Sequence, residues 1–247
     1  MRIDVVHLIS GADKKNLKRR KAMLQGFASP GTKIRLVQTS HAPASVESWA
    51  EMELAGPGIL ERVVQSEKEG ADAVVIWGGH DPSLAAAREL VKIPVLGPGM
   101  AAMYIAAVLA EQFSLLVQLS RVITIAQRQV RNLGLEGRCA SIRSVEVPVL
   151  QLVKMESFEL VRKIAIAAVE EDGADAICFG CMAFTDHADP LSRALAKSHP
   201  GVIVLHPAQA ALRLTELIVD MGLSHSKRNY PYPPKKVSFY PKDFSPQ

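Results

Sequence analysis

The sequence lacks the features of several classes of protein. It has only three cysteines, an odd number with no paired spacing, so no disulfide framework is expected. A reducing, cytoplasmic setting is therefore predicted. The longest apolar stretch, from Ala101 to Leu119, is interrupted by Glu111 and Gln112 and falls short of the roughly 18 apolar residues that a membrane span needs. The beginning, Met1 to Val6, is typical of a strand and not of a signal peptide.

Positive charge is too sparse to predict a nucleic-acid surface. The net charge is +4, and the most basic run, Lys14 to Lys21, is expected to form the solvated face of a first helix. Hydrophobic residues make up 48% and charged residues 22%, as in an ordinary globular protein. Metal-ligand spacing is missing as well, because Cys181 and His187 have no second Cys/His pair beside them. We therefore expect no metal, no nucleic acid and no membrane.

Short apolar runs alternate with longer helix-like stretches, a pattern that predicts a parallel α/β fold. Strands are expected in two sets of four, at residues 3–8, 33–37, 73–77 and 94–96, and at 113–117, 139–145, 176–179 and 202–205. Helices are expected at residues 58–69, 83–91, 101–111, 156–171, 189–198 and 208–221. The third strand of each set follows the same tripeptide, Gly70-Ala71-Asp72 and Gly173-Ala174-Asp175. Two similar lobes, each with a four-stranded parallel sheet, are therefore predicted.

The predicted lobes are not continuous in sequence. The first comprises residues 1–98 plus 208–230, and the second comprises residues 99–207. The remaining residues, 231–247, are rich in Pro, Tyr and Lys and are expected to form an extended C-terminal tail.

Cys181 is the most informative residue of the chain. It follows the apolar run Ala176 to Phe179 and a glycine, so it is expected at the carboxyl end of a parallel strand, where open α/β sheets bind ligands. Cys178 lies inside the apolar run and is expected in the core, not in a redox pair with Cys181. The equivalent turn of the first half, Trp77-Gly78-Gly79-His80, carries no cysteine.

The Cys181 thiol suits nucleophilic catalysis, metal binding or proton transfer. A nucleophile needs a base with an orienting partner, which His187-Ala188-Asp189 supplies only if the fold brings it near. Proton transfer needs less: a thiolate on one face of an acidic carbon, and N–H donors for the enolate oxygen. The candidate donors are the backbone N–H groups of Gly79, His80, Met182 and Ala183.

Five segments of the chain carry a family resemblance. They are residues 42–48, 81–89, 134–143, 147–152 and 222–227, among them Ala42-Pro43-Ala44-Ser45-Val46-Glu47-Ser48 and Gly134-Leu135-Glu136-Gly137-Arg138-Cys139. These segments resemble the hydantoin and allantoin racemase branch of the aspartate/glutamate racemase superfamily. The similarity covers residues 1 to 235 in order and almost without gaps.

The resemblance implies two flavodoxin-like lobes with the active site in the cleft between them, and cofactor-independent proton transfer at a carbon next to a carbonyl group. In the two-base form, a cysteine from each lobe faces one side of that carbon. Cys181 falls where the family has its second cysteine, and Gly78 falls where it has the first. Because glycine cannot accept a proton, symmetric two-cysteine racemisation is not available to this sequence.

Other positions around the cleft depart from the family pattern. His7-Leu8-Ile9-Ser10 replaces an Asn-Pro-Asn loop, and Gln118 stands where small hydroxyl residues are usual. His206 stands where an aspartate is frequent. Gly78-Gly79 either allows a tight turn or leaves room for a larger substrate group.

His80 is the candidate for the missing second acid/base, because a neutral imidazole suits proton transfer near pH 7. The alternative is a loop histidine that binds backbone or substrate without titrating. The predicted catalytic residues are thus Cys181 and His80. The predicted substrate-binding residues are His7, Ser10, Gly78, Gly79, Gln118, Met182 and Ala183.

Three functions remain open at this point. The leading hypothesis is a cofactor-independent racemase or epimerase that acts on a hydantoin or an amino-acid derivative. The second is a one-base enzyme similar to arylmalonate decarboxylase, with Leu8, Trp77 and Val117 lining an apolar pocket. The third is a ligand-binding relative without catalysis. The expected partner is a small-molecule substrate, and the family's tendency to assemble suggests a homo-oligomer.

Overall fold

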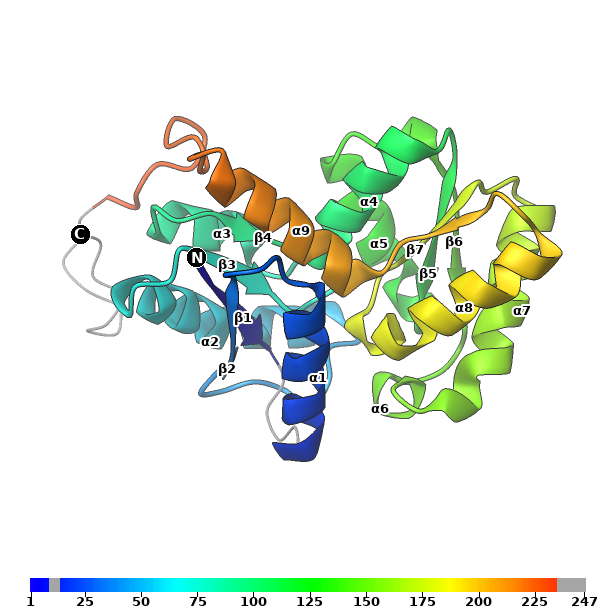
Figure 1. Cartoon of the computed structure of the whole chain (residues 1–247), viewed down its shortest axis with the longest axis horizontal. Helices are drawn as coiled ribbons and strands as arrows, with labels where there is room; N and C mark the ends of the chain where they lie inside the picture. The colour runs from blue at the N-terminus through cyan, green and yellow to red at the C-terminus, as the bar shows by residue number, and fades with distance from the viewer. Residues whose placement is uncertain (9–13, 235–247) are drawn as a thin grey trace.

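The computed structural model describes residues 1–8 and 14–234, and it places them in two α/β lobes side by side (Figure 1). The first sheet has the order β2-β1-β3-β4 and comprises β1 (Arg2–His7), β2 (Lys33–Gln38), β3 (Ala73–Ile76) and β4 (Val95–Leu96). The second has the order β6-β5-β7-β8 and comprises β5 (Phe113–Val117), β6 (Cys139–Ser144), β7 (Ala176–Phe179) and β8 (Ile203–Val204). All neighbouring strands are parallel. The two sheets therefore share one topology, which confirms the predicted fold class.

Helices pack on these sheets, and β3 and β7 are buried along their whole length, as expected for parallel strands with helices on both faces. The helices that pack on the first sheet are α1 (Lys14–Phe27), α2 (Trp49–Lys68), α3 (Leu84–Leu90) and α9 (Pro207–Asp220). The others are α4 (Pro98–Leu109), α5 (Ile123–Asn132), α6 (Val149–Leu152), α7 (Phe158–Glu170) and α8 (Thr185–Ser198).

The repeated tripeptide has the same structural role in both lobes. Its glycine has a positive φ in each copy, +82° and +73°, which favours glycine over other residues. Its aspartate then accepts a hydrogen bond from the backbone at the start of the neighbouring central strand. Asp72 accepts from the Arg2 N–H at 2.6 Å, and Asp175 accepts from the Gln112 N–H at 3.1 Å. The repeat therefore fixes the register of β3 and β7 in the same way.

The chain crosses between the lobes twice, through α4 and α9. Helix α4 follows β4 but packs against β5 and β7, whereas α9 follows β8 and packs against α1, β3 and β4. The two helices also pack against each other, side by side between the lobes (Figure 1). An apolar cluster accordingly runs from Ile3 and Val75 through Met103 of α4 to Leu115 and Cys178. The lobe boundaries at 98/99 and 207/208 stay predictions.

Several helices differ from the predicted ranges. Helix α2 begins at Trp49, well before the predicted start at residue 58, because Ser48 caps it by accepting a hydrogen bond from the Glu51 N–H at 3.3 Å. Helix α8 likewise begins at Thr185 and not at residue 189. Helix α5 was not predicted from the sequence. Many of its residues are polar or charged, as is common in loops.

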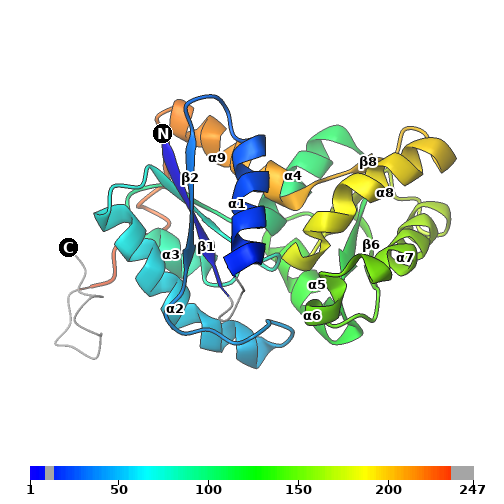
Figure 2. The same cartoon turned by 60° about the horizontal axis from the view of Figure 1, so that its bottom comes forward.

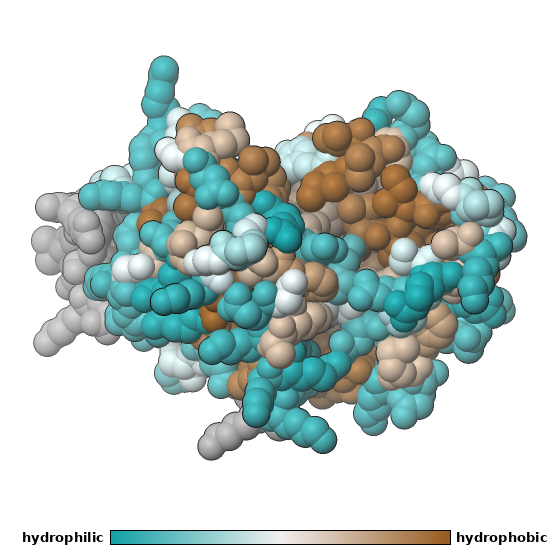
Figure 3. All heavy atoms as spheres, in the orientation of Figure 1, coloured by the Kyte–Doolittle hydropathy of each residue, from teal (hydrophilic) through white to brown (hydrophobic). Residues whose placement is uncertain are grey.

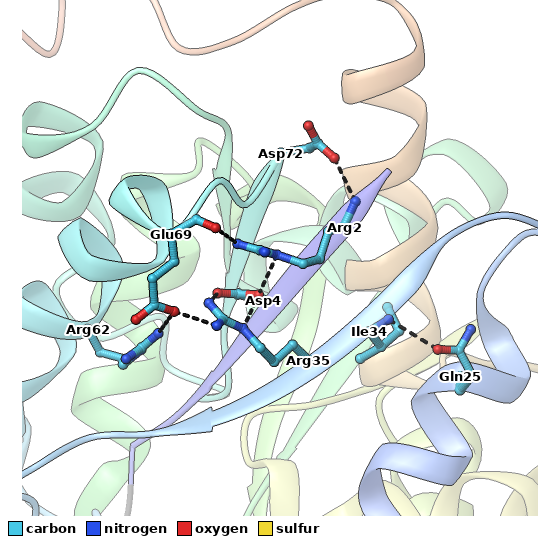
Figure 4. A network of polar contacts seen from close by, with 8 residues as sticks. All are labelled: Arg2, Asp4, Gln25, Ile34, Arg35, Arg62, Glu69 and Asp72. Carbon is cyan, nitrogen blue, oxygen red and sulfur yellow. Dashed lines mark hydrogen bonds and ion pairs between the residues drawn. The ribbon is translucent and has the colours of Figure 1, made fainter.

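Charged side chains close the amino-terminal end of the first sheet (Figure 4). Asp4 on β1 is fully buried, and its carboxylate accepts two hydrogen bonds from Arg35, one of them at 2.9 Å from Nε. Glu69 at the end of α2 pairs with the same arginine and, at 2.7 Å, with Arg62. Because the buried charge of Asp4 is paired here, this end of the sheet is occupied by structural contacts. The opposite, carboxyl end carries the cavity described below.

Some of the exposed apolar residues belong to α4, around which the space-filling view shows a hydrophobic area (Figure 3). Val108 and Leu109 are 83% and 57% exposed there. Ser10 and most of the predicted tail, residues 235–247, lie outside the described part of the chain. Within residues 1–8 and 14–234, no helix has the length and apolar character that crossing a membrane requires.

Candidate active site

A cavity of about 450 Å³ lies between the lobes, at the carboxyl ends of the central strands. Predicted site residues that line it are His7, Gly78, Gly79, His80, Gln118, Cys181, Met182 and Ala183. Leu8 and Trp77 also line it, as expected for an apolar pocket, together with Asn16, Arg20, Ala44, Val46, Met52, Pro82, Val149, Leu150, Val153 and Gly180. Val117 does not line the cavity, because it belongs to the apolar cluster of the core. The fold thus brings residues from both halves of the sequence into one site.

Cys181 stands directly after β7 and its glycine. It is the N-terminal cap of a short 3₁₀ helix, Met182–Phe184, and its Sγ accepts a hydrogen bond from the Ala183 N–H at 3.4 Å. Burial raises the pKa of Cys181 to about 11, although the Ala183 N–H opposes this shift. The side chain is therefore a neutral thiol near pH 7, and it is ready to donate a proton.

The other two cysteines have different surroundings. Cys178 is fully buried in the apolar cluster, as predicted, and burial raises its pKa well above the usual range. Cys139 is partly buried, and its Sγ donates to the Ser141 carbonyl at 3.4 Å. All three cysteines are free thiols. Cys181 is the one that meets the cavity.

His80 forms part of the cavity wall on the first-lobe side. Its edge lies against the second-lobe turn, because a Cβ at Gly180 would stand 3.3 Å from His80 Cε1. Both ring nitrogens are buried, and neither has a hydrogen-bond partner among the described residues. Burial lowers the pKa of His80 to about 4, with the Gln129 side chain opposing the shift. The imidazole is therefore neutral near pH 7.

Gly78 does not leave open space, and this corrects the expectation of room for a larger substrate group. A Cβ at Gly78 would stand 2.5 Å from Leu8 Cδ2 and 2.7 Å from Pro82 Cδ, so those two side chains already fill the position. The tight turn is present, closed by the Asp81 N–H donating to the Gly78 carbonyl at 3.0 Å, but neither Gly78 nor Gly79 has a positive φ, so the turn does not require glycine for that reason. Close packing is the reason for glycine at this position. The first-lobe face opposite Cys181 is consequently apolar at Gly78.

Gly79 is required for contact between the lobes. A Cβ at Gly79 would stand 2.3 Å from the Gly180 carbonyl oxygen and 2.6 Å from the Cys181 nitrogen. The two strand-end turns therefore meet backbone to backbone. Any side chain at Gly79 would displace the turn that carries Cys181.

Asp81 anchors the first-lobe turn to the second lobe. Its carboxylate accepts from the N–H groups of Gly99 at 3.0 Å and Met100 at 2.7 Å, which are at the start of α4. It also accepts from Gln129 Nε2 on α5 at 2.8 Å, and the same amide donates to the Gly79 carbonyl at 3.0 Å. Burial raises the pKa of Asp81 to about 7, and these N–H donors oppose that rise. Neither Asp81 nor Gln129 was singled out from the sequence.

The predicted N–H donors are only partly available. Among the described residues, the N–H groups of Gly79, His80 and Met182 donate to no other backbone group. The Ala183 N–H is different, because it donates to Cys181 Sγ. Ala183 therefore stabilises the thiolate form of Cys181, and only the other three groups are without a backbone acceptor among the described residues.

Three other histidines considered in the sequence, His7, His187 and His206, have different surroundings. His7 is fully buried at the end of β1, lines the cavity and contacts Arg20 through Nε2. His187 lies outside the cavity, where Nε2 is 2.8 Å from the Leu152 carbonyl, so it is not a base for Cys181. His206 caps α9 by accepting from the Gln209 N–H at 3.3 Å. The described residues contain no group of three His, Cys, Asp or Glu side chains arranged for a metal ion.

Comparisons with known proteins agree with this architecture. The family described as Asp/Glu/Hydantoin racemase matches residues 16–215. A hydantoin racemase of Pseudomonas sp. (strain NS671) is 37% identical over 214 residues, which span 85% of this chain and 83% of that protein. A hydantoin racemase of Paenarthrobacter aurescens is 35% identical over 86% of this chain and 89% of its own length.

Solved structures extend the likeness to the fold. An allantoin racemase from Klebsiella pneumoniae has a TM-score of 0.91 and 32% identity, covering 100% of this chain and 99% of that one. Unliganded arylmalonate decarboxylase has a TM-score of 0.57 and 16% identity, covering 88% of this chain and 92% of that one, so it shares the fold alone. The family match and the curated relatives together show that the chain belongs to the Asp/Glu/hydantoin racemase family and is an isomerase of that type.

Proposed function

We propose that this protein is a cofactor-independent racemase or epimerase that transfers a proton at a carbon next to a carbonyl group. Its substrate is a hydantoin or a related amino-acid derivative, as in the hydantoin and allantoin racemases that it resembles. The observation that carries the proposal is the Cys181 thiol, which meets a cavity between the lobes and has a backbone N–H donor on its sulfur. A metal is not part of the proposed chemistry.

In the proposed reaction, neutral His80 removes the proton from one face of the substrate carbon. The electrons of the broken C–H bond move to the carbonyl oxygen, and the resulting enolate is bound by the N–H groups of Gly79, His80 and Met182. Cys181 then donates its thiol proton from the opposite face. The imidazolium and thiolate that remain return to their neutral forms by the reverse reaction or by exchange with water. The directions of the two pKa shifts support these roles, because both groups start neutral.

One specific observation favours a second candidate function, protonation from a single face. Leu8 and Pro82 fill the position that a side chain at Gly78 would occupy, and both nitrogens of His80 are buried. In that case Cys181 protonates an enolate that forms by another route, such as loss of carbon dioxide from a malonate. The Cys181 thiol then supplies the only proton that reaches the carbon.

Solvent deuterium separates the two functions. The protein is incubated in deuterium oxide with one enantiomer of a 5-substituted hydantoin, and in parallel with an arylmalonate. A racemase places deuterium in both hydantoin enantiomers, whereas the one-face enzyme releases carbon dioxide from the malonate and labels one product enantiomer. A reaction without protein measures spontaneous hydantoin racemisation.

Variants identify the acid/base groups. Cys181→Ser is expected to lower the rate at least about a hundredfold, because it removes the proton-transfer group. The matched control, Cys139→Ser, changes a partly buried thiol outside the cavity and should keep its rate. His80→Asn should abolish racemisation and spare one-face protonation. Full activity in Cys181→Ser would rule out both candidate functions.

A further inference from the structure

Two segments from opposite lobes line one side of the cavity, and together they are called its roof. The connection between β2 and α2 in the first lobe contributes Ala44 and Val46, and α6 in the second lobe contributes Val149 and Leu150. These two segments are joined directly by Glu47. Its Oε1 accepts a hydrogen bond of 2.6 Å from the Val149 N–H. One side chain therefore connects the two halves of the roof.

Hydrogen bonds to neighbouring residues hold both the side chain and the backbone of Glu47 in place. Its Oε2 accepts from Ser45 Oγ at 3.0 Å, and its own N–H donates to Glu51 Oε2 at 2.7 Å. Glu51 belongs to the capped first turn of α2, where its Oε2 also accepts from Ser48 Oγ at 2.9 Å. The start of α2 thus fixes the Glu47 backbone, so the carboxylate is preorganised to reach across the cavity.

The same carboxylate acts electrostatically on Cys181. Its negative charge raises the pKa of the thiol, while the positive charge of Arg20 lowers it, and both effects are smaller than that of burial. The other titratable groups that line the cavity are His7 and His80. Of the two charges that act on Cys181, Glu47 belongs to the roof. Closing the roof therefore places a negative charge where it disfavours the thiolate.

We propose that Glu47 is a positioning residue that joins the β2–α2 loop to α6 and so holds the cavity closed over Cys181. The inference rests on the proposed role of Cys181 as the acid/base. It gives one side chain two separable effects. The hydrogen bond to Val149 holds the cavity closed around the substrate, and the charge favours the proton-donating state of the thiol.

Glu47→Gln separates charge from hydrogen bonding. The amide oxygen still accepts from the Val149 N–H, but the negative charge is gone. Alkylation of Cys181 by iodoacetamide, followed by mass spectrometry of its peptide across a pH series, measures the pKa of the thiol without requiring activity. The expected result is a lower pH midpoint, with at least about threefold more thiolate at a given pH for a shift of half a unit. The KM should change little.

Val149→Pro makes the complementary change. Proline removes the N–H that Glu47 accepts from and leaves the Glu47 charge in place. It suits this position because Val149 begins α6 and Pro148 has an extended backbone, φ −58° and ψ 148°. The expected result is a severalfold higher KM and a smaller shift of the alkylation midpoint than in Glu47→Gln. Glu47→Ala should show both effects together.

Glu53→Gln is the control, because it neutralises an exposed carboxylate of α2 that takes no part in the contacts of Glu47. Its KM and its alkylation midpoint should equal those of the original protein. An unchanged KM in both Val149→Pro and Glu47→Ala, or a KM raised equally in Glu53→Gln, would overturn the inference. That failure is distinct from failure of the proposed function, which is judged by the activity of Cys181→Ser.

Discussion

Leu8 and Gly78 lie far apart in the sequence but share one packing space at the end of the first sheet. Leu8 is 5% exposed, and its Cδ2 is the atom nearest to where a Cβ at Gly78 would stand. The two residues therefore act as a unit: a side chain at one position requires a smaller one at the other. This pairing explains how position 78 can hold glycine without leaving a void.

A double-mutant cycle tests the pairing. Gly78→Cys alone should lower the free energy of unfolding by about 1–3 kcal/mol, because the new side chain collides with Leu8 and Pro82. Leu8→Ala alone should cost about 2–5 kcal/mol by leaving a cavity. The double variant is expected to lose clearly less than the sum, since the cysteine occupies the vacated space. Denaturant unfolding of the four proteins gives the coupling energy.

Gly26 supplies the control for this cycle. A Cβ at Gly26 meets nothing within 4 Å, so Gly26→Cys combined with Leu8→Ala should be additive. Additive behaviour at Gly78 as well would show that Leu8 does not occupy the side-chain position.

At the scale of residues, sequence alone predicted that Cys181 lies at the edge of the sheet and which turns surround it, but not how those turns pack. The signal that predicted the position of Cys181 is local, because the cysteine follows an apolar run and a glycine directly in the sequence. The filling of Gly78 by Leu8 is a contact between separate strands, which no local pattern reveals. Asp81 and Gln129 were missed for the same reason, because their hydrogen bonds join elements that are distant in sequence. Asp81 did stand in a segment of family resemblance, which was the available signal.

At the scale of elements, the strands were predicted well and the helices less so. Apolar runs of four to six residues are unambiguous when both faces of a strand are buried, as in β3 and β7. Helix α2 was shortened in the prediction because Gly56, Pro57 and Gly58 together suggest a break. In the structure Pro57 lies within the helix. Its stability there comes from packing, with Ile59 and Val63 fully buried.

The segment after α9 is tied to the edge strand β4 by a titratable contact. His225 Nε2 accepts a 2.8 Å hydrogen bond from the Val95 N–H, so the ring must be neutral on that nitrogen. Lys227 Nζ donates to the Arg88 carbonyl at 2.7 Å close by. Burial lowers the pKa of His225 to about 4, with the charge of Arg88 acting in the same direction. The attachment of this segment therefore depends on pH.

Acid is expected to loosen the segment before the protein unfolds. The unfolded imidazole has a pKa near 6.5 and the folded one near 4, so the unfolded state binds more protons between these values. Stability from this contact is present above pH 6.5 and is lost as the pH falls towards 4. Hydrogen exchange at the Val95 amide should accelerate over that window. His225→Gln, whose side chain can still accept the bond without titrating, should weaken the pH dependence, whereas His41→Gln at an exposed site should not.

At the scale of the whole molecule, the lobes are joined on the α1 side by an ion pair. Arg19 on α1 donates two hydrogen bonds of 2.7 Å to Asp186 on α8, and the views place these helices beside each other (Figure 2). The Arg19 side chain is 55% exposed, so solvent screens the pair. Its contribution to stability is expected to be small, although it joins helices of the two lobes.

Removing this pair should affect substrate binding more than folding. Arg19→Ala, Asp186→Ala and the double variant should give a coupling energy below about 1 kcal/mol, falling as salt is added. The KM should nevertheless rise severalfold, because the lobes lose a contact that limits their separation. Arg162→Ala, which breaks a pair with Glu159 inside α7, is the control and should leave the KM unchanged. A KM in Arg19→Ala and Asp186→Ala equal to that of the original protein would show that the pair does not restrain the lobes.

The contact between Gly79 and Gly180 determines how the two lobes can move. Their backbones already touch, so the lobes cannot approach further at this point, and Asp81 and Gln129 prevent the turns from separating. These contacts restrain the two strand-end turns from both directions, so the turns act as a spacer of fixed length between the lobes. The distance between Cys181 and the first-lobe turn that faces it is therefore set by backbone atoms and not by side-chain conformation.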